Sequence, residues 1–92
     1  MIYAVKQTRR FARQYKKLLE NIIVDVDNAV EMVAERPSIG ERKKGALADL
    51  LAYKFRSQGQ FYLLGYTLDE NVQLVYLEAI GPYENFYRDL KR

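Results

Sequence analysis

The chain has 92 residues, of which 49% are hydrophobic and 29% are charged, a balance typical of one folded domain rather than of a disordered segment. It contains no cysteine and no histidine, which excludes disulfides, thiol chemistry and the usual zinc sites, so we expect neither a metal nor another cofactor. The net charge of +3 permits weak attraction to polyanions without by itself indicating one.

The N-terminal segment is predicted to form a strand that leads into a helix. Residues 1–7 are rich in β-prone side chains, and Thr8 offers a hydroxyl that can cap the helix. From Arg9 onward, apolar residues recur at spacings of four, three and four, which is typical of one buried helix stripe. This stripe consists of Phe11, Tyr15, Leu18 and Ile22.

A second helix is predicted to follow and to pair with the first as an antiparallel hairpin. Asn21 is expected to interrupt the first helix and to cap the second. Arg36 should end it, because the ring of Pro37 disfavours helical geometry at the preceding residue. The buried side is expected to contain Ile22, Val26, Ala29, Val30 and Val33.

A basic loop is predicted over residues 41–45, which include Arg42, Lys43 and Lys44. These three cations either form a solvated surface or contact the phosphates of a nucleic acid. The sequence alone leaves both alternatives open.

The C-terminal half is predicted to form three antiparallel strands and a short helix. Residues 50–56, 61–68 and 72–80 are rich in Tyr, Phe, Leu and Val and are separated by polar turns. Pro82 suits the first position of a helix, so the final helix is expected to begin there. The fold class is therefore α+β, with a strand, an antiparallel helix hairpin, a three-stranded meander completing one sheet, and a short C-terminal helix, in a single domain over residues 1–92.

Neither a membrane helix nor a signal peptide is expected. The apolar runs are far shorter than the roughly 20 residues that a membrane helix needs, and the N-terminus lacks the pattern of a signal peptide. We therefore expect a cytoplasmic protein without a membrane partner.

Strand alternation places two cations on one face of the expected sheet. If Tyr53 and Phe55 face the helices, Lys54 and Arg56 project together on the opposite face. Glu78 in the last strand can pair with them from the same side. These charges form either a solvated, salt-bridged surface or a site for an anion.

The last twelve residues place Tyr83 and Tyr87 four positions apart, with Arg88 beside them. Together with Phe86 and Leu90 these tyrosines have the spacing of a helix stripe that packs on the sheet, although their hydroxyls can protrude at its edge. Cations and phenols suit a phosphodiester, so the combination points towards RNA.

The order of these elements resembles the RelE/ParE superfamily of bacterial toxins from type II toxin–antitoxin modules, over essentially the whole chain. The motifs that carry the resemblance are TRRFARQY at 8–15, YKFR at 53–56, LLGY at 63–66 and ENFYRDL at 84–90. The resemblance implies a small α+β protein that cuts mRNA on the ribosome without a metal and is silenced by a cognate antitoxin.

In such members a ribose 2′-hydroxyl attacks the adjacent phosphate, which yields a 2′,3′-cyclic phosphate and a free 5′-hydroxyl. The resemblance assigns Lys54 and Arg56 to the charge on the phosphate, and Tyr87 to the 2′-hydroxyl or to stacking on a base. Tyr83 stands where many members carry histidine or arginine. A phenol is mostly protonated at neutral pH, so it suits proton donation or stacking. Arg42, Lys43, Lys44 and Arg88 are expected to contact nucleic acid.

The leading hypothesis is therefore a ribosome-dependent endoribonuclease whose partners are mRNA, the ribosome and an antitoxin. One alternative is a ParE-like inhibitor of DNA gyrase that cuts no nucleic acid. Another is a catalytically weakened relative, with Tyr83 in place of an active residue, that mainly binds its antitoxin.

Overall fold

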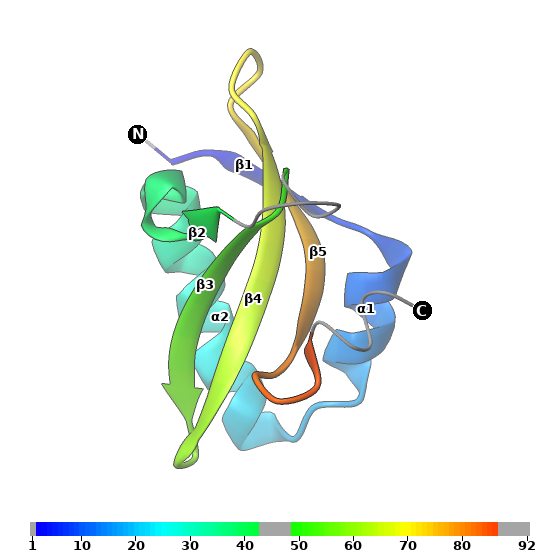
Figure 1. Ribbon diagram of the computed structural model, residues 1–92. Helices are drawn as coiled ribbons and strands as arrows, with labels where there is room; N and C mark the ends of the chain where they lie inside the picture. The colour runs from blue at the N-terminus through cyan, green and yellow to red at the C-terminus, as the bar shows by residue number, and fades with distance from the viewer. Residues whose placement is uncertain (1, 43–48, 87–92) are drawn as a thin grey trace.

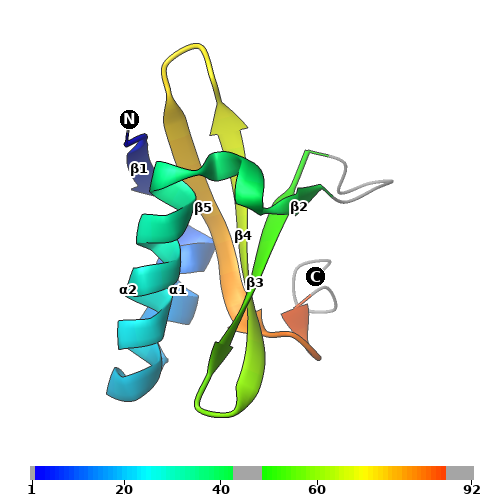
Figure 2. The ribbon, with the colours of Figure 1, turned by 90° about the vertical axis from the view of Figure 1, so that its left-hand side faces the viewer.

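Within residues 2–42 and 49–86, which the computed structural model describes, five strands form one sheet and two α-helices cover one of its faces (Figure 1, Figure 2). The elements are β1 (Ala4–Gln7), α1 (Arg9–Lys16), α2 (Glu20–Glu35), a 3₁₀ turn η1 (Pro37–Ile39), β2 (Glu41–Arg42), β3 (Leu51–Ser57), β4 (Gln60–Asp69) and β5 (Leu74–Pro82). The predicted α+β class is confirmed. No helix in these two ranges is long and apolar enough to cross a membrane.

The strand order is β1-β5-β4-β3-β2, and β3, β4 and β5 form the expected antiparallel meander. β1 joins the sheet beside β5 and runs parallel to it, with Ala4 opposite Leu74 and Gln7 opposite Leu77. Parallel pairing is possible because the two helices between β1 and the meander supply the long crossover that it requires. The first strand of the chain is thus an edge strand next to the last.

The boundary between the two helices differs from the prediction. Thr8 caps α1 as expected, since its Oγ1 accepts a hydrogen bond of 3.2 Å from the N–H of Phe11. α1 already ends at Lys16, however, and α2 begins at Glu20 after an N-cap at Leu19, so Asn21 does not cap it. The break escaped prediction because Leu18 packs against the core from the connection itself, which continues the apolar stripe through the turn.

The main core lies between the helices and the sheet, and a smaller one lies on the opposite sheet face. The buried members of the main core are Phe11, Val26, Ala29, Val33, Leu51, Leu64, Tyr66, Val75, Leu77 and Ile80. Those of the smaller core are Leu50, Ala52, Leu63, Ala79 and Phe86. The second sheet face is therefore apolar in its middle, and its exposed cations Lys54 and Arg56 lie towards the β3–β4 hairpin.

Two further predictions are corrected at the chain's turns. Arg42, expected in a loop, pairs opposite Leu51 in the two-residue strand β2, which is too short to show any periodicity. Pro82, expected to begin a helix, belongs to β5 and lies opposite Tyr62. The N–H of Tyr83 donates to the Phe61 carbonyl, so the neighbouring pair of Pro82 and Tyr62 is a non-hydrogen-bonded pair of the β4–β5 ladder. At such a position the backbone nitrogen points away from β4, towards the side of β5 where β1 lies further along. Since β1 pairs only with residues 74–77, no hydrogen bond is lost at Pro82. Residues 83–85 form a turn, and the remainder of the expected helix from Tyr87 onward, which includes Arg88, lies outside the described residues.

Tyr66 ties the sheet to the segment between α2 and β2. Its buried phenol donates a hydrogen bond to the Pro37 carbonyl and accepts one of 2.9 Å from the N–H of Gly40. A Cβ at Gly40 would lie 2.2 Å from the phenol oxygen, so only glycine allows this approach. Burial raises the pKa of Tyr66 above its ordinary value, and the hydrogen bond from Gly40 offsets part of the shift.

We expect the protein to lose stability at alkaline pH because of Tyr66. Below about pH 10, which is the pKa of a tyrosine in the unfolded chain, Tyr66 keeps its proton in the folded and the unfolded state, and stability does not change with pH. Above that pH only the unfolded state ionises, so the free energy of unfolding falls. The fall ends once the pH passes the raised pKa of Tyr66 in the folded state. Tyr15, whose pKa is raised by its hydrogen bond to Asp27, adds to the fall. Urea unfolding at about pH 8 and about pH 11 measures the effect. Tyr66→Phe should be less stable at the lower pH and should show a shallower fall; an equal fall would contradict this origin.

Candidate functional site

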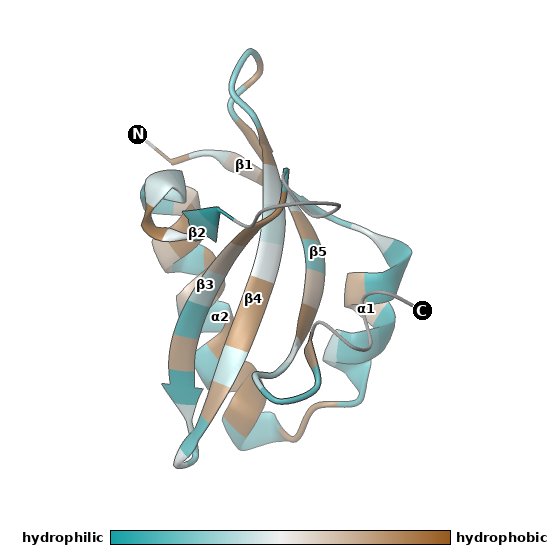
Figure 3. Cartoon of the chain, in the orientation of Figure 1, coloured by the Kyte–Doolittle hydropathy of each residue, from teal (hydrophilic) through white to brown (hydrophobic). Residues whose placement is uncertain are grey.

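The alternation of β3 places its two cations on the sheet face away from the helices. Tyr53 and Phe55 pack against the main core, with ring centroids 6.1 Å apart, whereas Lys54 and Arg56 are exposed. The alternation of polar and apolar residues is visible along β3 in Figure 3. The predicted grouping of Lys54 and Arg56 on one face is confirmed.

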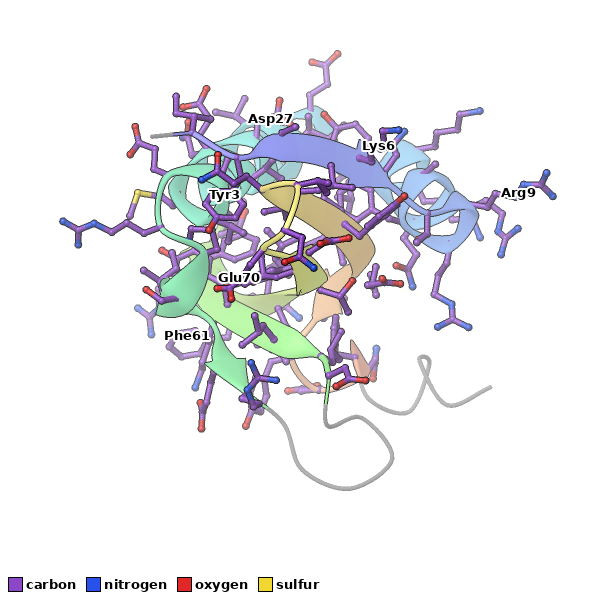
Figure 4. The ribbon with its side chains drawn as sticks, turned by 90° about the horizontal axis from the view of Figure 1, so that it is seen from above. Tyr3, Lys6, Arg9, Asp27, Phe61 and Glu70 are labelled. Carbon is purple, nitrogen blue, oxygen red and sulfur yellow. The ribbon has the colours of Figure 1, made fainter. Side chains whose placement is uncertain are left out.

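Two aromatic rings lie beside these cations. Phe61 in β4 is paired directly opposite Arg56, and its side chain is 40% exposed. Tyr83, which follows β5 and is 48% exposed, donates its backbone N–H to the Phe61 carbonyl at 2.9 Å. Figure 4 shows Phe61 on the opposite side of the strands from Asp27 of α2. The rings thus share the face of Lys54 and Arg56.

The four side chains make direct cation–π contacts and are called the sheet-face cluster below. The Nζ of Lys54 lies 4.4 Å from the ring centroid of Phe61 and 4.6 Å from that of Tyr83. The Cζ of Arg56 lies 4.8 Å from the centroid of Phe61. These distances fall within the roughly 6 Å over which a ring attracts a cation. Three predicted site residues, Lys54, Arg56 and Tyr83, therefore meet in one place.

Neither cation of the cluster has a carboxylate partner in the part of the chain that the structure describes. Glu78, expected to be able to pair with them, instead accepts a hydrogen bond of 2.9 Å from the Thr67 hydroxyl. The strand register explains the difference. Lys54 pairs with Leu63, which in turn pairs with Gly81 of β5, whereas Glu78 lies at the register shift of β5 opposite Gly65 and Tyr66. No described carboxylate therefore neutralises the positive charge of the cluster.

A surface depression of about 250 Å³ adjoins the cluster. Its lining consists of Gly59, Gln60, Phe61, Tyr83 and Glu84. The β3–β4 hairpin that forms one wall turns through Gln58 and Gly59, both with positive φ. Ser57 fixes the same hairpin to α2, because its buried hydroxyl donates a 2.7 Å hydrogen bond to Asp25. The depression therefore has a well-anchored wall.

The other predicted nucleic-acid contacts are not brought to the cluster. Arg42 lines hollows with Leu68 and Glu70, near the start of β3 rather than beside Lys54 and Arg56. Lys43, Lys44, Tyr87 and Arg88 lie outside the described residues.

Phe61 is a member of the cluster that sequence reasoning missed. Residues 58 and 59 form a two-residue turn between β3 and β4. Counting back from this turn pairs Arg56 with Phe61, which would have placed the ring beside the cations.

Phe86 anchors the chain after β5 on the same sheet face. Its side chain is 3% exposed and belongs to the smaller core, as its expected role in packing on the sheet requires. A Cβ at Gly65 would lie 2.7 Å from the Cζ of Phe86, so the glycine provides the space for the ring. Phe86 directly precedes Tyr87 in the sequence.

The sheet-face cluster combines groups that bind an anion with groups that bind a flat apolar ring. Lys54 and Arg56 can hold a phosphate, and exposed aromatic rings can stack on a nucleobase. Within the described ranges, no three acidic side chains lie close enough to share a metal ion. The chemistry open to the cluster is that of cations, a phenol and aromatic faces.

Comparison with known proteins gives a family match and a fold match. The model of a family described as the ParE-like toxin of type II bacterial toxin–antitoxin systems matches residues 5–91. Comparison with the curated proteins gives no significant match.

Three solved structures have a similar fold at 22–24% sequence identity. A Mycobacterium tuberculosis RelBE toxin–antitoxin complex has a TM-score of 0.79, with 89% of this chain and 92% of that chain covered. A mutant of the Escherichia coli toxin RelE in the free state has a TM-score of 0.77, with 99% and 92% covered. The intact Escherichia coli RelBE complex has a TM-score of 0.71, with 87% and 95% covered.

Proposed function

The chain belongs to the ParE-like toxins of type II bacterial toxin–antitoxin systems, and on that premise we propose that it is a metal-independent, ribosome-dependent mRNA endoribonuclease. The observation that carries the proposal is the sheet-face cluster, where Lys54 and Arg56 lie beside two aromatic rings and form no ion pair with any described residue. A pair of cations that no described carboxylate neutralises suits a phosphodiester, since no described counter-ion has to be displaced before the phosphate binds.

In the proposed reaction the 2′-oxygen of a ribose attacks the adjacent phosphorus and the bond from phosphorus to the 5′-oxygen breaks. Lys54 and Arg56 stabilise the negative charge that accumulates on the phosphate oxygens. The phenol of Tyr83 donates a proton to the departing 5′-oxygen, while Tyr87 hydrogen-bonds the 2′-hydroxyl, whose proton passes to solvent water as the new bond to phosphorus forms. The products are a 2′,3′-cyclic phosphate and a 5′-hydroxyl.

The proposed partners are mRNA on the ribosome and a cognate antitoxin. Two of the similar structures are toxin–antitoxin complexes, which supports an antitoxin as partner. Arg42, Lys43, Lys44 and Arg88 are proposed to contact ribosomal RNA phosphates. This assignment places the protein in the cytoplasm, where its substrate is found.

We expect purified protein to cut mRNA inside codons on programmed ribosomes. The 2′-oxygen is the nucleophile, so one 2′-deoxy nucleotide at the cut position should abolish cleavage there and leave neighbouring cuts in place. Primer extension maps the cuts, and phosphatase-resistant 3′ ends identify the cyclic phosphate. Cleavage that survives the 2′-deoxy substitution would contradict the mechanism.

The alternative function as a gyrase inhibitor is favoured by the half-exposed rings of Phe61 and Tyr83, because aromatic residues are enriched at protein interfaces. Blocked supercoiling by purified gyrase, together with intact mRNA, would support it.

A third proposal is a weakened relative that mainly binds its antitoxin. For this case, Tyr83→His should restore cleavage that the natural protein lacks.

A further inference from the structure

The two cations of the sheet-face cluster need something to hold them. Lys54 and Arg56 lie two positions apart on one strand face, so their like charges repel. Long side chains of this kind lose considerable rotamer entropy when they are fixed. No carboxylate among the described residues supplies the usual restraint, since neither side chain forms an ion pair there. What does contact both of them is the ring of Phe61.

We propose that Phe61 is a positioning residue that holds Lys54 and Arg56 side by side for the phosphate, an inference that rests on the ribonuclease function proposed above. The Phe61 ring centroid lies 4.4 Å from Nζ of Lys54 and 4.8 Å from Cζ of Arg56. One ring therefore restrains both charges.

An aromatic ring has an advantage over a carboxylate in this position. A glutamate at residue 61 could also hold the two cations, but its negative charge would cancel part of their field and compete with the phosphate for them. The ring attracts cations through its quadrupole and carries no net charge. Phe61 thus restrains Lys54 and Arg56 while leaving their full positive charge for the substrate.

The backbone that carries the ring is held at several points. Phe61 lies opposite Arg56 in the β3–β4 ladder, and its carbonyl accepts the backbone N–H of Tyr83 at 2.9 Å. The hairpin that carries it is fixed to α2 by the hydrogen bond from Ser57 to Asp25. A positioning group must be better fixed than the groups that it positions, and the backbone of Phe61 meets this condition.

The test compares Phe61→Leu, which keeps an apolar side chain but has no ring, with the matched variant Phe61→Tyr, which keeps the ring. On programmed ribosomes, Phe61→Leu should lower kcat about 10- to 100-fold with little change in KM, because misplaced cations weaken transition-state stabilisation and leave ribosome binding intact. Phe61→Tyr should retain kcat. Thermal unfolding shows that both variants are folded.

A second readout does not depend on catalysis. In the NMR spectrum of the full chain, ring currents should shift the ε-methylene signal of Lys54 upfield, and Phe61→Leu should move it towards the position of an unfolded lysine. Phe61→Tyr should leave it in place.

Two outcomes would overturn the role of Phe61: an unchanged Lys54 signal in Phe61→Leu, or loss of kcat that is equal in Phe61→Leu and Phe61→Tyr. If wild-type protein leaves mRNA intact, the proposed ribonuclease reaction fails, and the Lys54 signal alone then decides whether Phe61 holds the cations.

Discussion

Replacing Lys54 by alanine will lower the rate of mRNA cleavage by about 10²- to 10³-fold, the usual cost of losing one group that stabilises transition-state charge. The ammonium lies within 4.6 Å of two aromatic centroids and has no carboxylate partner among the described residues. Its removal leaves no buried charge unpaired, so the free energy of unfolding should change by only about 0.5 kcal/mol. The loss should therefore appear in catalysis and not in folding.

The matched control is Lys6→Ala. Lys6 is an exposed lysine on β1, at the opposite edge of the sheet from β3, and is labelled in Figure 4. Lys6→Ala removes the same charge from the protein as Lys54→Ala, so it corrects for any general weakening of the protein's electrostatic attraction to the ribosome. Single-turnover cleavage with excess protein measures the chemical step for both variants. Equal losses in Lys54→Ala and Lys6→Ala would show that Lys54 acts only through net charge.

Phe86→Ala will destabilise the protein by about 3 kcal/mol, because it leaves a cavity where the ring packs on the sheet over Gly65. The ring is 3% exposed and packs with Leu50, Ala52, Leu63 and Ala79. Urea unfolding measures the loss. Since Phe86 directly precedes Tyr87, we also expect cleavage to fall by more than the unfolded fraction explains.

A double-mutant cycle with Gly65→Ala tests the contact itself. Alone, Gly65→Ala should cost about 1–3 kcal/mol, because its Cβ would come 2.7 Å from the Cζ of Phe86 and the ring must move. In the background of Phe86→Ala the new methyl group enters vacated space, so the same change should cost little or should stabilise. Additive effects in the double mutant would mean that the two residues do not meet as described.

The sequence was most informative where local alternation alone decides the outcome. Lys54 and Arg56 were placed on one face because neighbouring strand positions point to opposite sides. Thr8 was recognised as a cap because its hydroxyl is suited to a free N–H in the first turn. Both features depend only on residues close in sequence.

Other features escaped because they depend on distant pairing or on competing local signals. The end of α1 was hidden because Leu18 packs on the core from the connection. Pro82 suits the start of a helix, but it also suits the end of a strand at a position where no neighbouring strand would accept a hydrogen bond from a backbone N–H. Phe61 was overlooked as a site residue because its partner, Arg56, is fixed only by the register across the hairpin. The expected pairing of Glu78 with Lys54 and Arg56 was wrong for the same reason, since it depends on the register between strands.

The placement of β1 beside β5 has a consequence for the order in which a nascent chain acquires structure. β1 is made first, but its sheet partner begins only at Leu74, so this pairing has a high contact order and must wait for most of the polypeptide to be synthesised. Tyr83, which joins Lys54, follows the same late strand. A partly synthesised chain that ends before Leu74 therefore carries Lys54, Arg56 and Phe61 but lacks Tyr83, so the sheet-face cluster is complete only after this late strand has been made.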